Sequence, residues 1–513
     1  MPLPHTGSTA VLDEALLPAA PPAPHAQPPS PSTARPSHIV ALLLILGAAT
    51  FLRFHNLAAR GLWMDEGVSA AITRLSWDNF TTLLEWREGN MSLYYLLLRG
   101  WAQLGFSEFH LRSLSVLFGS LTVLAVYYLG KELYGRAAGL VAALILALHP
   151  FHIHYSQEAR SYALLGLTLV LATYFMLRAL RTGSQAHFMG FVVSGALSVY
   201  AHFFAVLCLP PLLCAALVFP ERKAEPRKLV SAAALLVLLA FPGMQYAWRH
   251  QNIGLIDWIP APSWDLLARC AAALLGVPGL LGLAYFAAIL ALLLVGKAPA
   301  ESQSRASLRW TALPGLWSLV PGLVLLAASF HKPILIDRYL LMCVPGVALL
   351  GAYAFHGLSR AWRTVFACVV VLVAALSIPA SYRAFAADSQ DWKGAVGYAI
   401  QHAQPDDVVL LDNGIVRPIF EYYRWQFQAS APRVNSFGPR SERLNYADFA
   451  GITPPAVVGR MARIRDRVWI FEWGPPNPLV PEMDRHFRKE LSREYAHVKV
   501  TLYVCGSSAG MSP

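Results

Sequence analysis

Long runs of apolar residues, repeated along most of the chain, constrain its fold more than any other feature. Several of the runs between residues 38 and 381 approach the length that an α-helix needs to cross a hydrocarbon core of about 30 Å. Of the 513 residues, 56% are hydrophobic and only 14% are charged, whereas charged residues make up roughly a quarter of an ordinary soluble domain. The sequence therefore predicts an α-helical membrane protein that crosses the bilayer several times.

Hydropathy places about eleven spans along the chain. The ranges are 38–55, 111–130, 137–154, 160–179, 187–201, 203–220, 229–247, 277–296, 310–330, 338–356 and 364–381. Because the apolar stretches at 203–220 and 264–276 are short, the count ranges from about nine to thirteen. The stretch 92–106 is apolar but interrupted by Arg99, and we expect it to lie along the membrane interface as a helix.

The distribution of Lys and Arg supports one orientation of these spans. With the N-terminus inside, the inside loops are "GKELYGR", "RALRTGSQ", "ERKAEPRK", "GKAPAESQSRASLR" and "LSRAWR". All are basic, as cytoplasmic loops usually are. Residues 56–110 and everything after residue 381 then lie outside. The net charge of +11 thus follows from membrane topology and does not indicate nucleic-acid binding.

Three regions follow from this pattern. Residues 1–37 are rich in Pro and Ala and predict a disordered cytoplasmic tail. Residues 38–381 form the transmembrane domain, with a first outer loop at 56–110. In residues 382–513, "DDVVLLDN", "RVWIFEWG" and "VKVTLYVC" predict strands, whereas "IVRPIFEYYRWQF" and "MDRHFRKELSREY" predict amphipathic helices. Such alternation is typical of a small α/β domain, here outside the membrane. Because it has no glycine-rich phosphate loop, we expect a binding or acceptor-positioning role for it rather than nucleotide chemistry.

Ionisable side chains gather at the span ends that this topology places outside. They are costly at a membrane and mark functional sites more often than chance would. The first are Asp65 and Glu66 in "GLWMDEGVSA", followed by Arg112 at the start of the second span. The others are Glu158, Arg160 and Tyr162 in "FHIHYSQEARSYA", then His202, and finally Arg338 with Tyr339.

These residue types suit chemistry on a phosphate ester. A carboxylate can take the proton of an attacking hydroxyl, and the guanidinium fork of arginine matches phosphate oxygens. Adjacent residues on a helix point about 100° apart, so at most one of Asp65 and Glu66 is expected to enter a pocket, and Asp65 is favoured. Ordinary structural explanations also exist, since acids favour helix starts and arginines reach toward lipid headgroups. His202 alone would more often be a packed interfacial side chain than a ligand.

Several motifs resemble one family of membrane enzymes. "LWMDEGVSA", "SLYYLLLRGW", "ALHPFHIHYSQEARSYALL" and "DRYLLMCVPGVALL" look like family 39 of the GT-C glycosyltransferases. That family includes protein O-mannosyltransferases and the aminoarabinose transferases of lipid A. The resemblance implies an integral membrane enzyme that moves a sugar from a polyprenyl phosphate to an acceptor at its outer face, usually with inversion.

The resemblance also implies roles for single residues. Asp65 matches the acidic residue of the family's first loop, the presumed base or acceptor-positioning carboxylate, and Glu66 matches the acid beside it. Arg112, Glu158, Arg160, Tyr162, Arg338 and Tyr339 are the candidates for binding the phosphate and sugar of the donor. Many relatives have a basic residue and two prolines before "LYY", but this chain has Asn90, Met91 and Ser92 there. One of the arginines is then expected to replace the missing cation.

No cofactor is required by these patterns. Glu158 and His202 are compatible with a divalent metal ion but do not select one, and the six cysteines form no metal or disulfide motif. The expected partners are a polyprenyl-phosphate sugar, a lipid, glycan or protein acceptor, and membrane lipids, with no nucleic acid.

The function expected is sugar transfer at the outer face of a membrane, most simply the bacterial inner membrane. A transporter or flippase of lipid-linked glycans is one alternative, although the internal repeats typical of transporters are missing from the sequence. A ligase of surface glycans and a non-catalytic scaffold that binds a partner are two others.

Overall fold

A computed structural model describes most of the chain. The described residues are 36–217, 223–249, 258–277, 304–387, 389–404, 407–411, 414–427, 458–459, 466–474 and 477–505. The predicted N-terminal tail, apart from its last two residues, and almost all of the predicted span at 277–296 lie outside the described residues.

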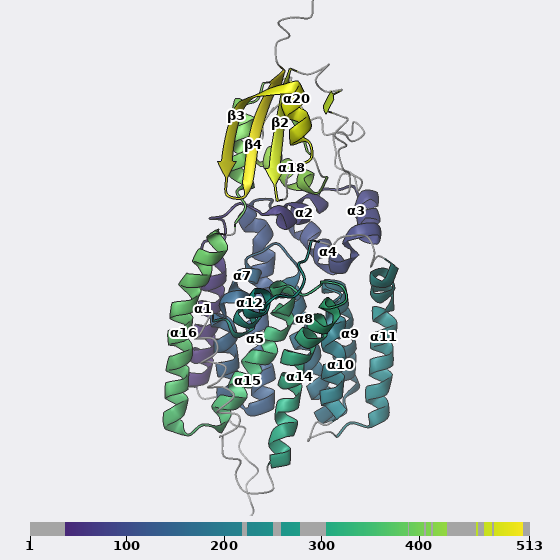
Figure 1. The fold of residues 1–513 in the computed structure, drawn as a ribbon. Coiled ribbons are helices and arrows are strands. Elements are labelled where there is room, and N and C mark those ends of the chain that lie inside the picture. Colours follow the sequence, from purple (N-terminus) through teal and green to yellow (C-terminus); the bar gives the residue numbers. More distant parts are fainter. Residues whose placement is uncertain are drawn as a thin grey trace, which may run out of the picture.

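A bundle of apolar helices forms the larger part of the molecule (Figure 1). Its first half contains α1 (Pro36–Phe54), α5 (Glu108–Tyr134), α6 (Arg136–Leu148), α7 (Pro150–Ser156), α8 (Tyr162–Thr182), α9 (Gln185–Ala201) and α10 (Ala205–Leu217). Its second half contains α11 (Pro226–Arg249), α12 (Trp264–Leu275), α14 (Ser304–Ser329), η3 (Asp337–Cys343), α15 (Val344–Gly357) and α16 (Arg360–Ala387). The predicted helical membrane fold is therefore confirmed.

The predicted spans fall on these helices wherever the structure describes them. Among the described residues, seven helices are long and apolar enough to cross a membrane, or eight if the bent pair α6–α7 counts as one span. The helices α9 and α10 are shorter, with 17 and 13 residues. The ambiguous stretch at 264–276 is the 12-residue helix α12.

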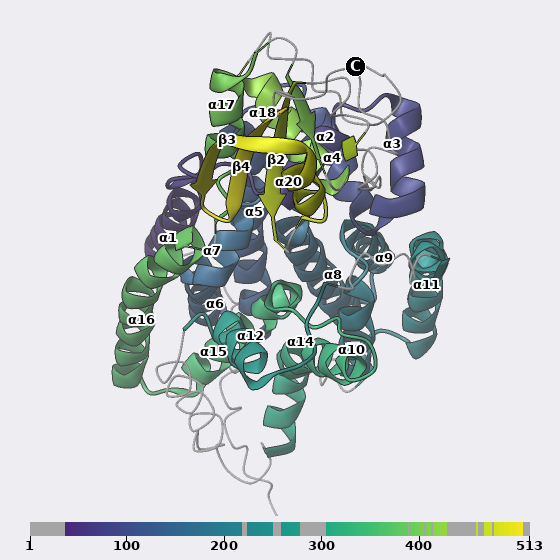
Figure 2. The same ribbon diagram turned by 45° about the horizontal axis from the view of Figure 1, so that its top comes forward.

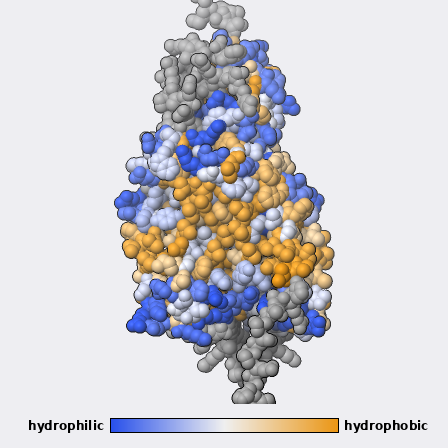
Figure 3. Space-filling model, turned by 180° about the vertical axis from the view of Figure 1, so that it is seen from behind, coloured by the Kyte–Doolittle hydropathy of each residue, from blue (hydrophilic) through white to orange (hydrophobic). Residues whose placement is uncertain are grey.

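The surface of the bundle carries a belt of apolar side chains. Figure 3 shows this belt between two polar zones. It includes Leu44, Val237 and Leu376, which are 69%, 57% and 57% exposed. Large apolar side chains exposed in such numbers would be unfavourable in water, so the belt fits a lipid environment.

A break between α6 and α7 shapes the end of the bundle that carries the site. Pro150 has no N–H, so the carbonyl of Leu146 loses its helical partner, and the two helices meet at an angle of 64°. Arg53 of α1, fully buried, donates hydrogen bonds to the carbonyls of Leu146 (3.2 Å) and Ala147 (3.1 Å). This cation therefore satisfies the acceptors that the break exposes.

The first loop folds into short helices at the same end of the bundle. They are α2 (Met64–Ile72), α3 (Trp77–Leu83), η1 (Leu84–Glu88), η2 (Gly89–Met91) and α4 (Ser92–Trp101). The helix expected at 92–106 thus exists but ends at Trp101. Arg99 of α4 donates to the carbonyls of Thr73 (3.2 Å) and Leu75 (2.8 Å), which ties α4 to the end of α2.

In the described residues after the bundle, a four-stranded sheet is accompanied by three α-helices. The strands β1 (Val408–Leu410), β2 (Arg467–Trp473), β3 (Phe487–Tyr495) and β4 (Val498–Cys505) lie in the order β1-β2-β4-β3. β1 pairs with β2 in parallel, and the other pairs are antiparallel. The helices are α17 (Trp392–His402), α18 (Arg417–Gln426) and α20 (Val480–His486).

One predicted element of this part is wrong. "MDRHFRKELSREY" was expected to be a helix, but the helix α20 ends at His486 and residues 487–495 form the edge strand β3. Pairing with β4 over eight residue pairs, from Phe487 with Cys505 to Tyr495 with Val498, overrides the helical pattern of this charged segment. Its exposed charges suit an edge strand, because they discourage pairing with other chains.

The sheet and its helices sit directly on the first loop (Figure 2). α18 packs on α2 so closely that a Cβ added to Gly67 would lie 2.5 Å from the Cβ of Ile419. The backbone N–H of Leu62 donates to the hydroxyl of Tyr423, and that of Met64 donates to Gln390 (3.2 Å). The position of α2 is thus fixed from above by the C-terminal part of the chain.

The basic loops lie at the opposite end of the bundle. The turns at residues 135 and 183–184 and the connection from α15 to α16 are all at this end, away from the sheet (Figure 1). The helices therefore alternate in direction so that these loops share one end of the bundle, as the distribution of Lys and Arg predicted. Which end faces the cytoplasm stays a prediction.

Candidate active site

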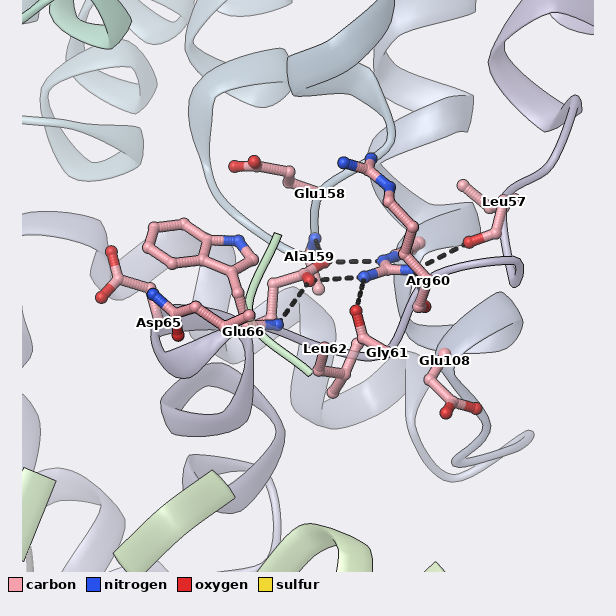
Figure 4. Close-up of polar contacts among 12 residues, drawn as sticks. Leu57, Arg60, Gly61, Leu62, Asp65, Glu66, Glu108, Glu158 and Ala159 are labelled. Atoms are coloured by element: carbon pink, nitrogen blue, oxygen red, sulfur yellow. Dashed lines mark hydrogen bonds and ion pairs between the residues drawn. The ribbon is translucent and has the colours of Figure 1, made fainter. Parts of the chain in front are cut away.

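The two acids of the opening motif occupy the first turn of α2. Acidic side chains are favourable there because the helix dipole is positive at its N-terminus. Asp65 and Glu66 leave the helix in different directions, as Figure 4 shows. Their surroundings differ so much that the two carboxylates are suited to different tasks.

Glu66 is fully buried and bound on both oxygens. Arg112 of α5 holds it with two hydrogen bonds, from Nε to Oε1 (2.8 Å) and from Nη2 to Oε2 (2.6 Å). The backbone N–H of Ala159 donates to the same Oε1 (2.8 Å) (Figure 4). The carboxylate therefore joins α2, α5 and the segment after α7 at one point.

Arg112 uses its remaining donors on the chain before α2. It donates to the carbonyls of Leu57, Arg60 and Gly61, each at 2.8 Å. Burial by itself would raise the pKa of Glu66, but the charge and hydrogen bonds of Arg112 and the N–H of Ala159 lower it below its usual value. Glu66 thus stays ionised, and both partners of this pair are saturated with hydrogen bonds.

Asp65 is in a more open position, with 21% of its side chain exposed. Its Oδ2 lies 3.4 Å from Nη1 of Arg338 and 3.7 Å from Nη2 of Arg160. These separations are longer than those around Glu66, so the contacts are looser. The arrangement puts one accessible carboxylate between two guanidinium groups.

The two arginines are held from different sides. The guanidinium of Arg338 lies over the rings of Trp63 and Trp258, at 5.5 and 5.1 Å from their centroids. Arg160 donates to the hydroxyl of Tyr95 (3.1 Å) and to the carbonyl of Asp65 (3.3 Å). Its buried Nε has no hydrogen-bond partner among the described residues. Both cations are thus positioned, yet each keeps donor capacity.

Glu158, another predicted residue of the site, pairs with His154. Its Oε1 is 3.1 Å from Nε2 of His154, whose ring stacks on Phe385 of α16 with centroids 3.5 Å apart. The other oxygen, Oε2, is buried without a partner in the described part of the chain. Glu158 therefore keeps one buried oxygen that no described residue satisfies.

His202, Tyr162 and Tyr339 form an aromatic wall. The ring of His202 lies 5.9 Å from that of Tyr162 and 5.7 Å from that of Tyr339. Burial, together with the charges of Arg160 and Arg338, lowers the pKa of His202 to about 3, so the imidazole is neutral. In the described residues, no group of three or more His, Cys, Asp or Glu side chains could hold a metal ion. That Glu158 and His202 are compatible with a metal ion stays a prediction.

Two side chains that sequence reasoning missed belong to the same network. Tyr95 of α4 donates its hydroxyl proton to Oε2 of Glu88 (3.0 Å) and accepts a hydrogen bond from Arg160. Tyr95 stands in the "LYY" motif, and Glu88 stands two residues before Asn90, the position of the missing cation. An acid so close to a motif residue was the signal available in the sequence.

Glu88 should make the stability of the protein depend on pH. Burial raises the pKa of its carboxyl above the usual value, although Arg160 and Tyr95 act in the opposite direction. A raised pKa means that the folded state holds this proton more tightly, so the stabilisation is present at low pH and is lost as the pH rises through the raised pKa. Glu88→Gln should remove this loss and raise Tm relative to the original chain by roughly 1–3 °C near pH 7, with little difference near pH 4.

Thermal unfolding in detergent between pH 4 and pH 8 measures this effect. The exposed neighbour Glu85 provides the control, and Glu85→Gln should leave the pH dependence unchanged. A parallel curve for Glu88→Gln and the original chain would show that Glu88 does not titrate in this range.

Comparisons with known proteins agree with this fold. Residues 92–246 match the family model described as dolichyl-phosphate-mannose-protein mannosyltransferase. The structure of ArnT from Cupriavidus metallidurans bound to undecaprenyl phosphate superimposes with a TM-score of 0.62 at 13% identity, covering 93% of this chain and 100% of that one. The apo structure of ArnT gives the same TM-score at 12% identity, covering 91% of this chain and 98% of that one.

Two curated proteins match over shorter stretches. The putative mannosyltransferase YkcB of Bacillus subtilis (strain 168) is 26% identical over 235 residues, 42% of this chain and 31% of its own length. Subunit STT3B of the dolichyl-diphosphooligosaccharide–protein glycosyltransferase of Arabidopsis thaliana is 42% identical over 84 residues, 15% of this chain. The match covers only 11% of that subunit, so the chain spans less than a third of either relative. The chain thus has the GT-C glycosyltransferase fold that its motifs predicted, and its residues 92–246 match the dolichyl-phosphate-mannose-protein mannosyltransferase family.

Proposed function

We propose that the protein transfers a sugar from a polyprenyl phosphate to a hydroxyl group of a lipid, glycan or protein acceptor. The observation that carries the proposal is the position of Asp65, a partly exposed carboxylate between the guanidinium groups of Arg160 and Arg338. Sugar transfer from a phosphate needs a proton acceptor on one side and positive charge on the other, and this site offers both. The fold shared with ArnT, which was crystallised with undecaprenyl phosphate, supports a lipid phosphate as the donor.

The proposed reaction assigns each part of the site a task. The acceptor oxygen attacks the anomeric carbon of the sugar, and the bond from that carbon to the phosphate oxygen breaks. The hydroxyl proton passes to Asp65, and the bonding electrons leave with the polyprenyl phosphate. The guanidinium groups of Arg160 and Arg338 stabilise the charge that builds on this leaving group.

Donor binding would also prepare the base. Without a donor, Asp65 neutralises the two arginines at 3.4 and 3.7 Å. A phosphate carries more charge and can form two parallel hydrogen bonds with a guanidinium group, so it competes with Asp65 for these donors. The carboxylate then becomes available to the acceptor.

Three arginines, Arg112, Arg160 and Arg338, could replace the cation missing at Asn90. Arg160 and Arg338 remain as candidates, because Arg112 is saturated by Glu66.

Glu66 and Arg112 take a positioning role in this proposal. Their bonds connect α2, α5 and the chain before α2, so they set where Asp65 stands. The contacts of Tyr423 and Gln390 with the N–H groups of Leu62 and Met64 support the same helix from the C-terminal part of the chain.

The proposal keeps the three regions that the sequence predicts. They are a tail at 1–37, a membrane domain at 38–381 and a C-terminal domain at 382–513, with the site on the outer face of a bacterial inner membrane.

Binding of the lipid phosphate tests the assignment of Arg338. Arg338→Gln should weaken the binding of undecaprenyl phosphate by about 10–100-fold, because a hydrogen bond to a charged group is worth roughly 1.5–3 kcal/mol. Titration of the purified protein in detergent, followed by its intrinsic tryptophan fluorescence, measures the affinity. Trp63 and Trp258 next to Arg338 make the signal sensitive to this site.

The control for this titration is Arg269→Gln, which removes an exposed arginine of α12. It should bind undecaprenyl phosphate with unchanged affinity. Equal affinities of Arg338→Gln and Arg269→Gln would remove Arg338 from the proposed phosphate site.

A further inference from the structure

A cavity lies between α9 and α11, away from the candidate active site. Its volume is about 330 Å³. It is lined near the beginning of both helices, by Gln185 of α9 and by Arg227 and Lys228 of α11. Because α9 and α11 both begin at the end of the bundle opposite the C-terminal sheet (Figure 1), the cavity lies at that end.

The cavity combines a cationic rim with apolar walls. Phe188, Val192 and Ala232 form buried parts of the wall, and the exposed side chain of Leu235 continues it along α11. Further along these helices, Val193 and Val237 are 46% and 57% exposed and belong to the apolar surface of the bundle. A ligand in this cavity therefore meets positive charge at one end and an apolar path toward the lipid belt at the other.

Lys228 supplies the positive charge that a ligand in this cavity would meet. It is half-buried, and its ammonium group forms no ion pair or hydrogen bond within the described residues. Arg227 beside it is exposed and pairs with Glu225. Ser231, one turn after Lys228, and Gln185 add groups that can donate hydrogen bonds to a phosphate.

We propose that this cavity binds an anionic phospholipid of the leaflet at that end of the bundle. Basic pockets between membrane helices suit such headgroups. The apolar walls suit the acyl chains of a lipid, whereas a water-soluble phosphate would leave these walls in contact with water. The charge of Lys228 and Arg227 selects a lipid with net negative charge over a zwitterionic one.

The bound lipid would support a helix that also reaches the candidate active site. At its other end, α11 places the hydroxyl of Tyr246 where it accepts the N–H of Gly89 (3.2 Å), next to Glu88. A Cβ on Gly89 would lie 2.8 Å from the ring of Tyr246, so this contact is close. Any influence of the lipid on sugar transfer rests on the proposed function, whereas binding of the lipid does not.

Lipid binding to the full-length protein tests the inference. Purified protein in detergent is titrated with dioleoylphosphatidylglycerol, and Tm and the retained lipid, counted by native mass spectrometry, are measured. Phosphatidylglycerol should raise Tm and stay bound, whereas dioleoylphosphatidylcholine should do neither. Lys228→Gln should weaken the binding of phosphatidylglycerol by about fivefold, and Lys228→Arg should retain it.

Two controls separate this site from general attraction to basic loops. Arg360→Gln removes an exposed arginine that begins α16 at the same end of the bundle, and it should leave binding unchanged. Glycerol phosphate alone should neither raise Tm nor displace the lipid. Equal binding of both lipids, equal losses in Lys228→Gln and Arg360→Gln, or a Tm increase with glycerol phosphate alone would overturn the proposal.

Discussion

Replacing Asp65 with Asn should lower the rate of sugar transfer by about 10²–10⁴-fold, the usual contribution of a general base. The exchange removes the proton acceptor but keeps the shape of the side chain. Because the contacts of Asp65 with Arg160 and Arg338 are loose, at 3.7 and 3.4 Å, the fold should not depend on them. Tm in detergent should therefore stay close to its original value, and the loss should appear in kcat. The affinity for undecaprenyl phosphate should not fall, because the carboxylate charge that competes for Arg160 and Arg338 is removed.

The exposed acid Asp78 of α3 provides the matched control. Asp78→Asn makes the same chemical change in the same loop, and it should transfer sugar at the original rate. If Asp65→Asn and Asp78→Asn were equally active, Asp65 would not be the base.

Glu66→Gln should lower the stability of the fold, whereas Asp65→Asn should lower the rate of transfer. It leaves Arg112 buried without its counterion, and breaking a buried pair in this way costs about 3–5 kcal/mol. Both side chains are at most 3% exposed, so solvent offers little compensation. Tm should fall by several degrees, and transfer should fall with the fraction of folded protein.

Two further variants show whether this loss comes from the unpaired charge. Glu66→Gln combined with Arg112→Gln should be less destabilising than the sum of the two single changes, because no lone charge stays buried. Glu225→Gln, in the largely exposed pair with Arg227, should hardly change Tm. An unchanged Tm for Glu66→Gln with complete loss of transfer would make Glu66 a catalytic residue and contradict its positioning role.

The membrane fold could be predicted because hydropathy and charge report it independently. The long apolar runs predict helices that the structure contains wherever it describes the chain. The basic loops predict which ends of these helices lie together. The error at residues 487–495 has a different origin. A charged edge strand carries little signal of its own, and its identity comes from β4, which follows it in the chain.

The sequence predicted that the residues of the candidate site lie near one another, but it did not predict their contacts. The 100° between neighbouring helical residues separates Asp65 from Glu66, and the structure does point them in different directions. That Arg112 saturates Glu66, and that Glu158 pairs with His154, depends on how α5 and α7 approach α2. Such tertiary distances leave no local pattern.

The support of the site from outside the membrane bundle was also hidden in the sequence. Tyr423 contacts the N–H of Leu62 across 361 positions of the chain. Only Gly67 gave a local indication, because a glycine on a short helix can mark a close approach, here of Ile419 at 2.5 Å from an added Cβ. The C-terminal part therefore contacts the helix of Asp65 directly, whereas its acceptor-positioning role stays a prediction.

The most direct test of the account is a transfer assay in sealed vesicles containing the purified protein. The vesicles receive a panel of radiolabelled undecaprenyl-phosphate sugars and extracted cell-envelope acceptors, and free undecaprenyl phosphate and labelled acceptor are measured together. The account predicts that one donor is consumed with equal amounts of both products, and that Asp65→Asn lowers the rate at which both form by about 10²–10⁴-fold. Movement of intact lipid-linked sugar across the vesicle membrane, without release of undecaprenyl phosphate from any donor, would contradict it and identify a transporter.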